Sequence, residues 1–250
     1  MEILEFGDTS KKKLIFIHGF QSMWYVWEKY IEYYKNEYHI IVPILPGHNP
    51  NKKEEFNSFE ETAKELEDYC ISKYGKNIYL VYGVSMGGVL ATRLLKNKRL
   101  RINKVIFDGS PLVAYSDMLE NMLIKFYTDI THKTQARDKK TLKTAKKMIV
   151  PQGRMEEFLK IMDNMSGKTI ENFIKEIRKN RISNDIDISN LEMHYHHGTK
   201  MNETIAKKTA KYIKKWYPRA NIVCFKGKGH CEGFSSKPEN RIDILDQILS

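Results

Sequence analysis

The feature that most constrains this sequence is a serine between two glycines, Gly83-Val84-Ser85-Met86-Gly87, where an apolar run changes into a helical pattern. The preceding run, Ile78 to Tyr82, has the length and character of a buried parallel strand. The glycines allow a strand and a helix to approach closely around a tight turn, with a strained serine at its tip. Ser85 is therefore a candidate nucleophile, although so short a motif also occurs by chance in ordinary turns.

Length and composition set the limits of the fold. A chain of 250 residues with 41% hydrophobic residues can form one large α/β domain, or one domain with an insertion. No apolar run approaches the ~20 residues that cross a membrane, so we expect no stable membrane insertion. The first residues, MEILEFGDTSKKK, carry an acid at position 2 and no long apolar stretch, which argues against a secretory signal.

The three cysteines, Cys70, Cys224 and Cys231, are odd in number and show no C-x-x-C spacing. This pattern argues against both a disulfide framework and a zinc site. It suits a reducing compartment, so we expect a cytoplasmic protein without a metal ion.

The net charge of +11 allows an anionic partner, but the lysines are spread along the chain, often beside glutamates. One block is concentrated: Thr131 to Lys147 holds seven Lys or Arg and one Asp. Lys133, Arg137, Lys140 and Lys147 would share one side of a helix. A solvated helix face is the favoured interpretation, because no nucleic-acid-binding motif accompanies the block. Binding to an anionic polymer is the weaker alternative.

Strand and helix signals alternate along most of the chain, which predicts βαβ units and a mostly parallel sheet of about six strands flanked by helices. A capping box, Ser58-x-x-Glu61, marks the start of one helix. Between residue 111 and about residue 190 the strand signals stop, and Met-rich, Lys-rich helical stretches replace them. This segment is expected to be a helical insertion between two strands. The expected strands are Lys13–Phe20, Tyr38–Leu45, Ile78–Tyr82, Ile102–Ser110, Leu191–Gly198 and Ala220–Gly227.

A serine nucleophile needs a neighbouring base and a site for the developing negative charge. His230 is the best base by position, because it follows the last expected strand within a glycine-rich loop. An oxyanion hole needs two backbone N–H groups. We expect one from Met86, directly after the serine, and one from Phe20, in the loop after the first buried strand.

With these pieces the chain resembles the α/β-hydrolase family. The motifs His18-Gly19-Phe20, Pro46-Gly47-His48, Gly83-Val84-Ser85-Met86-Gly87-Gly88 and Gly229-His230 occur in the order typical of that family, and the resemblance covers nearly the whole chain. It implies a hydrolase core, residues 1–110 and 191–250, with a helical cap at residues 111–190. Only MEILEF remains for the antiparallel strands with which family members begin.

The acid that should orient His230 is not at the family's usual place. The family usually has Asp three residues after the glycine that ends its penultimate strand, and here that position is Met201. Asp108, at the end of the strand after the nucleophile helix, is the preferred substitute. Glu203 is the alternative, although it also resembles a helix cap. A dyad without an acid stays possible.

Together these features predict a serine hydrolase that cleaves a small acyl ester, thioester or related carbonyl compound through an acyl-enzyme. Ser85 attacks, His230 moves the proton, Asp108 orients His230, and Phe20 and Met86 bind the oxyanion. No cofactor and no nucleic acid are implied, and the sequence leaves the oligomeric state open. The alternatives are an acyltransferase on the same fold, or a hydrolase-shaped binding protein with weak or no catalysis.

Overall fold

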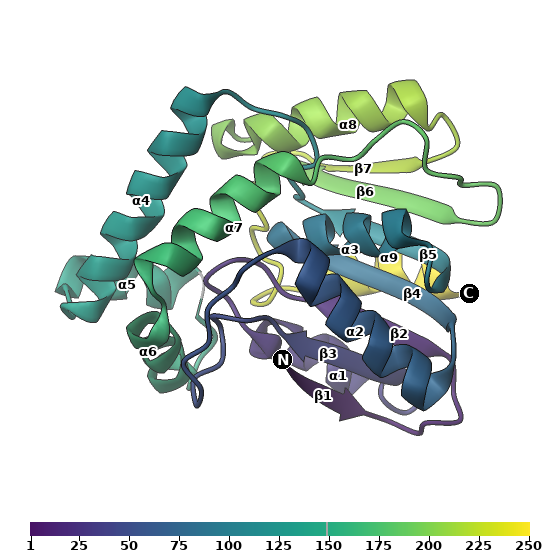
Figure 1. The fold of residues 1–250 in the computed structure, drawn as a ribbon, viewed down its shortest axis with the longest axis horizontal. Helices are drawn as coiled ribbons and strands as arrows, with labels where there is room; N and C mark the ends of the chain where they lie inside the picture. The colour runs from purple at the N-terminus through teal and green to yellow at the C-terminus, as the bar shows by residue number, and fades with distance from the viewer. Residues whose placement is uncertain (149) are drawn as a thin grey trace.

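A single sheet forms the centre of the computed structural model, which describes residues 1–148 and 150–250 (Figure 1). Its seven strands lie in the order β1-β3-β2-β4-β5-β6-β7. All neighbours are parallel except β1, which pairs antiparallel with β3. The six predicted strands are confirmed, and MEILEF adds β1. The strands are β1 (Glu2–Phe6), β2 (Lys13–Ile17), β3 (His39–Ile44), β4 (Asn77–Val84), β5 (Arg101–Asp108), β6 (Glu192–Gly198) and β7 (Asn221–Phe225).

The central strands are apolar over most of their buried length because both faces of the sheet are covered. Successive residues of β2 alternate between two clusters: Leu14 and Phe16 pack on one face, and Ile15 and Ile17 pack on the other. This alternation follows from the two-residue period of a strand. A strand buried on both faces must be apolar at every position, which is why it reads as a continuous hydrophobic run.

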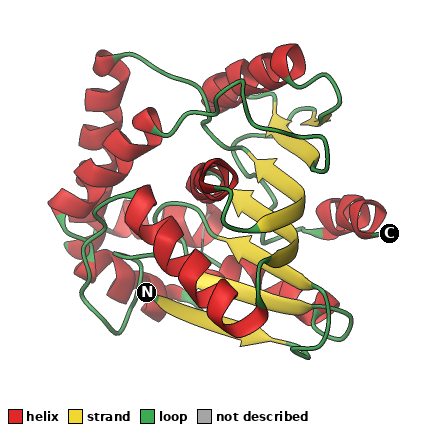
Figure 2. Ribbon diagram, turned by 45° about the vertical axis from the view of Figure 1, so that its right-hand side comes forward, coloured by secondary structure: helices red, strands yellow, loops and turns green. Residues whose placement is uncertain are grey.

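Helices cover the two faces of the sheet (Figure 2). Side chains of α2, α3 and α8 join the cluster on one face, and those of α1 and α9 join the cluster on the other. The predicted cap of α2 is present, since Ser58 Oγ accepts a hydrogen bond from the Glu61 N–H at 3.1 Å. The bounds are η1 (Trp24–Trp27), α1 (Glu28–Tyr34), α2 (Phe59–Tyr74), α3 (Met86–Asn97), η2 (Met201–Glu203), α8 (Thr204–Trp216) and α9 (Glu239–Leu249).

In the described part of the predicted insertion, four further helices lie between β5 and β6 along the chain. They form a group beside the sheet, on the side away from α9 (Figures 1 and 2). They also contact the loop after β2: the Phe20 ring lies 5.0 Å from that of Tyr127 and 5.1 Å from that of Phe173, centroid to centroid. The bounds are α4 (Asp117–Gln135), α5 (Lys139–Met148), α6 (Met155–Asn164) and α7 (Gly167–Lys179).

The basic block does not form one helix face, so that expectation is wrong. The block is divided between the end of α4 and α5, with Arg137 between them in a left-handed conformation (φ 58°). Arg137 also forms an ion pair with Asp163 at 2.7 Å. The lysines of the block therefore belong to two helices, α4 and α5.

Among the described helices, none is long and apolar enough to cross a membrane.

Candidate active site

The turn between β4 and α3 holds Ser85 in a strained conformation. Its φ and ψ are 52° and −116°, values that a residue with a side chain rarely adopts. The flanking glycines make the turn possible. A Cβ at Gly83 would collide with the backbone of Gly87 and Gly88, and one at Gly87 would collide with the carbonyl groups of Ile17 and His18. The sequence motif thus acts through close packing of a strand against a helix, as predicted.

His230 lies against the serine, from the loop after β7. Its Nε2 is 2.9 Å from Ser85 Oγ, and its Nδ1 is 2.7 Å from Glu203 Oε1. A carboxylate can only accept a hydrogen bond, so Nδ1 carries the ring proton and donates a hydrogen bond to Glu203. Nε2 is then free to accept from the serine hydroxyl. This is the tautomer that a base acting on Ser85 requires.

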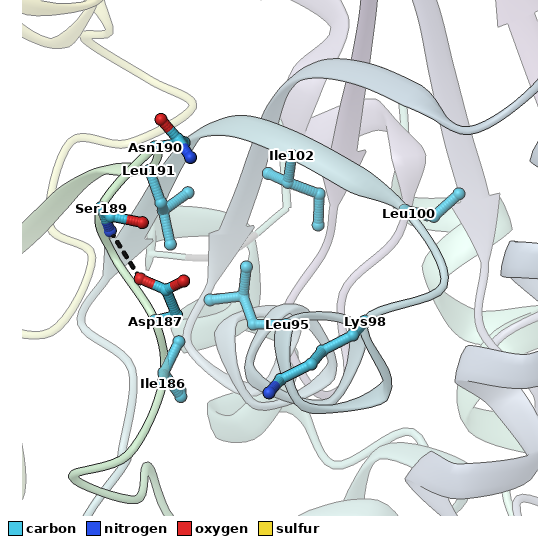
Figure 3. A pocket seen from close by; sticks show the side chains of 9 residues that line it. All are labelled: Leu95, Lys98, Leu100, Ile102, Ile186, Asp187, Ser189, Asn190 and Leu191. Atoms are coloured by element: carbon cyan, nitrogen blue, oxygen red, sulfur yellow. Dashed lines mark hydrogen bonds between the residues drawn. The ribbon is translucent and has the colours of Figure 1, made fainter.

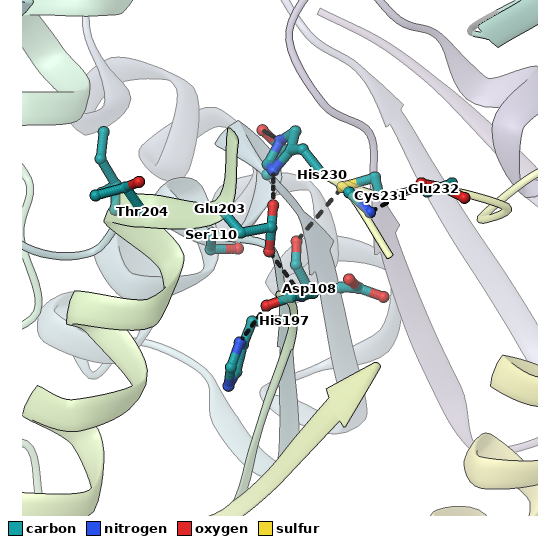
Figure 4. Close-up of polar contacts among 12 residues, drawn as sticks. Asp108, Ser110, His197, Glu203, Thr204, His230, Cys231 and Glu232 are labelled. Carbon is teal, nitrogen blue, oxygen red and sulfur yellow. Dashed lines mark hydrogen bonds and ion pairs between the residues drawn. The ribbon is translucent and has the colours of Figure 1, made fainter. Parts of the chain in front are cut away.

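Glu203 reaches His230 from the single turn of η2, directly before α8 (Figure 4). The residue is 1% exposed, and its second oxygen accepts the N–H of Gly198 at 2.8 Å. The side chain makes no capping hydrogen bond to α8, so Glu203 does not have the helix-capping role that its position in the sequence suggested. Met201, at the family's usual place for the acid, is 89% exposed. Glu203 lies two residues after Met201. The turn of η2 and the length of the glutamate side chain together bring its carboxylate to the His230 ring.

Asp108 does not contact His230, and the predicted contact between them is wrong. The Asp108 carboxylate points away from the ring and accepts from Arg241 Nε at 2.7 Å and from the Tyr82 hydroxyl at 3.1 Å. Burial alone would raise the pKa of Asp108, but the Arg241 guanidinium, helped by His196, lowers it below its ordinary value. The side chain was expected to solve the problem of the missing acid. Instead it neutralises the buried Arg241 of α9, a pairing that the sequence did not indicate.

Replacing Asp108 by asparagine should therefore destabilise the protein. Arg241 is 6% exposed, and loss of its partner would leave a buried charge uncompensated, at a cost of about 3–5 kcal/mol. Chemical denaturation at neutral pH measures this loss. Asp243→Asn is the matched control. Asp243 is exposed on α9, the helix that carries Arg241, and its replacement should change the free energy of unfolding by less than about 0.5 kcal/mol. Equal stability of the two variants would contradict this role of Asp108.

The two residues predicted to bind the oxyanion, Phe20 and Met86, belong to segments that adjoin Ser85. Met86 is the first residue of α3, where a helix leaves its N–H groups without internal acceptors. The loop that carries Phe20 is close as well, because a Cβ on Gly19 would lie 3.4 Å from Ser85 Cβ. Among the hydrogen bonds of the described residues, neither N–H is a donor. Both are therefore available to an external acceptor.

Two buried histidines fix the loop that contains Phe20. His18 Nε2 accepts the Leu45 N–H at 3.1 Å, and His48 Nε2 accepts the Gln21 N–H at 3.0 Å. Burial lowers the pKa of His18 to about 4 and that of His48 well below its ordinary value. Both rings are therefore neutral at physiological pH, as acceptors must be. Both histidines belong to the motifs shared with the α/β-hydrolase family, but the sequence alone did not indicate this bracing role.

Other polar and hollow regions lie apart from Ser85. A pocket of about 220 Å³ is lined by residues at the amino ends of β5 and β6, including Ile102 and Leu191 (Figure 3). Ser85 follows the carboxyl end of its strand, at the opposite edge of a parallel sheet, so this pocket takes no part in the site. In the described residues, no group of three or more His, Cys, Asp or Glu side chains could hold a metal ion.

Comparisons with known proteins agree with this architecture. A family model described as the alpha/beta hydrolase fold matches residues 12–200. Pimeloyl-[acyl-carrier protein] methyl ester esterase of Legionella pneumophila (strain Corby) is 29% identical over 123 residues, which are 47% of this chain and 48% of that protein. The chain thus spans about half the length of the curated relatives it matches.

Solved structures resemble the chain over nearly its whole length. A carboxylesterase structure from Nitrososphaera gargenis has a TM-score of 0.75 at 14% identity and covers 99% of this chain and 93% of its own. MenH from S. aureus has a TM-score of 0.71 at 17% identity, covering 98% and 96%. At these identities the likeness concerns the fold.

Proposed function

Because this chain belongs to the α/β-hydrolase fold family, we propose that it is a serine hydrolase in which Ser85, His230 and Glu203 form a catalytic triad. The observation that carries the proposal is the continuous chain of hydrogen bonds from Ser85 Oγ through His230 to Glu203, at 2.9 and 2.7 Å. Serine is a poor nucleophile without a base, and this arrangement supplies both the base and the carboxylate that fixes its tautomer. Glu203 thus replaces Asp108 as the proposed acid.

The proposed reaction has two halves. Ser85 Oγ attacks the acyl carbon while His230 Nε2 takes the hydroxyl proton, and the carbonyl oxygen becomes negative. The N–H groups of Phe20 and Met86 bind that oxyanion. Collapse expels the leaving group, which takes the proton from His230 and leaves an acyl-serine. Water then attacks the acyl group with His230 again as base, which releases the acid and restores Ser85.

The substrate class we propose is a small acyl ester or thioester. Relatives of this chain include proteins named as esterases, one of them for a methyl ester carried on acyl-carrier protein. Helices α4 to α7 are proposed to act as a cap that shapes the acyl site, supported by the contacts of Tyr127 and Phe173 with Phe20. The cytoplasmic location drawn from the cysteine pattern is part of this proposal.

A screen of p-nitrophenyl esters and acyl thioesters of increasing chain length tests the function. Hydrolysis with a preference for one range of lengths is expected. Adding alcohols of increasing size would reveal acyl transfer as alcoholysis products. Absence of turnover, together with no reaction of Ser85 with a fluorophosphonate, would favour the hydrolase-shaped binding protein instead.

The pH dependence of the reaction should reflect the charges around His230. Burial lowers the pKa of His230, but the adjacent Cys231 sulfur and the Glu203 carboxylate outweigh it and raise the pKa well above its ordinary value. Only the neutral ring can take the proton from Ser85, so kcat/KM should fall as the pH drops through this raised pKa.

Glu203→Gln removes the carboxylate charge beside His230 Nδ1 and should lower the pKa of His230. NMR titration of the His230 ring proton measures the shift directly, even when turnover is slow. Glu239→Gln, an exposed position at the start of α9, is the control and should leave the titration unchanged. A His230 titration that is the same with and without the Glu203 charge would remove the electrostatic part of the proposal.

A further inference from the structure

Gln21, directly after Phe20, has a backbone conformation that residues with a side chain rarely adopt. Its φ is 52°, in the left-handed region where glycine is the favoured residue. The residue is nonetheless a glutamine and only 7% exposed. Strain of this kind persists only where the surrounding contacts fix the residue. The contacts of Gln21 therefore show what this strained position provides.

Hydrogen bonds fix Gln21 from opposite directions, and its side-chain amide also lies 3.5 Å from the Tyr127 carbonyl and 3.8 Å from Met165 Sδ. Its backbone N–H donates to His48 Nε2 at 3.0 Å, which anchors it to the hydrolase core. Its side-chain amide donates to Thr131 Oγ1 at 2.8 Å, which anchors it to α4 in the inserted helices. The Thr131 hydroxyl itself donates to the Tyr127 carbonyl at 2.8 Å, so its lone pair is directed by the helix and remains available to Gln21.

We propose that Gln21 is a positioning residue: it ties the loop after β2, which carries the Phe20 N–H, to α4. The inference rests on the proposed function, because its catalytic consequence requires the Phe20 N–H to bind the oxyanion. The Phe20 N–H lies in the peptide plane before Phe20, and the Gln21 N–H lies in the plane after it. The two planes meet at the Phe20 Cα, so release of the Gln21 side chain removes a restraint on the carboxyl side of Phe20 and lets its backbone dihedrals change. The direction of the Phe20 N–H thus depends on the contact of Gln21 with α4 as well as on its contact with the hydrolase core.

Thr131 offers a matched pair of variants for the test. Thr131→Val keeps the shape of the side chain but removes the acceptor, whereas Thr131→Ser keeps the hydroxyl. The valine variant should lose about fivefold to tenfold in kcat, with KM changed less than about twofold, because a donor used mainly in the transition state is misplaced. The serine variant should retain the wild-type kcat.

Gln21→Gly separates positioning from stability. Glycine relieves the backbone strain, so the thermal midpoint should stay within about 5 °C of wild type, while kcat falls as in Thr131→Val. A purely structural role of Gln21 predicts the reverse, a loss of stability with normal turnover by the folded protein.

Backbone amide exchange gives a readout that does not need activity. The Gln21 N–H, protected by His48, should exchange faster in Thr131→Val than in Thr131→Ser. Equal exchange in the two variants, or an unchanged kcat in Thr131→Val when the wild type is active, would overturn the inference and leave the proposed function intact. A wild type that hydrolyses no ester would refute the proposed function, and the exchange comparison would still decide the role of Gln21 in holding the loop.

Discussion

Ser85→Ala is expected to abolish ester hydrolysis, with kcat reduced by as much as ~10⁶-fold, the scale found when a triad serine is removed. The reason is chemical, because alanine offers no oxygen to form the acyl-enzyme. The fold should be unaffected, since the Ser85 hydroxyl makes its hydrogen bond to His230 alone among the described side chains. Turnover of a p-nitrophenyl ester, with circular dichroism as the test of folding, measures both effects.

Ser110→Ala is the matched control for this substitution. Ser110 is a buried serine near the same turn, and its hydroxyl lies 3.5 Å from the Gly83 carbonyl rather than beside His230. Turnover by this variant should stay near the wild-type value. If Ser85→Ala were as active as Ser110→Ala, the nucleophile would lie elsewhere.

Glu203→Gln should lower kcat by about 10⁴-fold while the protein stays folded, the size of effect known when a triad acid is replaced by its amide. The amide can present its NH₂ group to His230 Nδ1 and favour the wrong tautomer, and it has no charge to stabilise the imidazolium. The buried Gly198 N–H can still be satisfied by the amide oxygen, so the backbone should hold. Steady-state kinetics together with a thermal melt separates the two effects.

Asp108→Asn provides the contrast for this prediction. It should impair stability first, and any folded fraction should keep the Ser85–His230–Glu203 hydrogen bonds. A stable Asp108→Asn protein with turnover reduced about 10⁴-fold, alongside an active Glu203→Gln protein, would support Asp108 as the acid and refute the triad with Glu203.

Much of the fold could be predicted because its cause is local. The buried strands are apolar runs in the sequence. Gly83 and Gly87 mark the contact between β4 and α3, where there is no room for a Cβ. Ser85 and His230 were identified because each occupies a loop at the carboxyl end of a strand, and those ends meet at one edge of a parallel sheet. The strand pairing does bring them within hydrogen-bonding distance.

The acid could not be assigned because its choice depends on contacts far apart in the sequence. Asp108 and Glu203 both lie near carboxyl ends of strands, and position along the chain does not separate them. Arg241, 133 residues beyond Asp108, decides the matter by taking that carboxylate. Gln21 was missed for a similar reason, since nothing local shows that its φ is positive or that Thr131 faces it.

The most direct test of the central claim is to trap the acyl-enzyme. The wild-type protein is mixed with a fluorophosphonate or a slowly hydrolysed p-nitrophenyl ester, quenched, and analysed by intact mass and peptide mapping. We predict one adduct per chain, located on Ser85, absent in Ser85→Ala and formed much more slowly in Glu203→Gln. An adduct on another residue, or turnover without any adduct on Ser85, would contradict this account of the site.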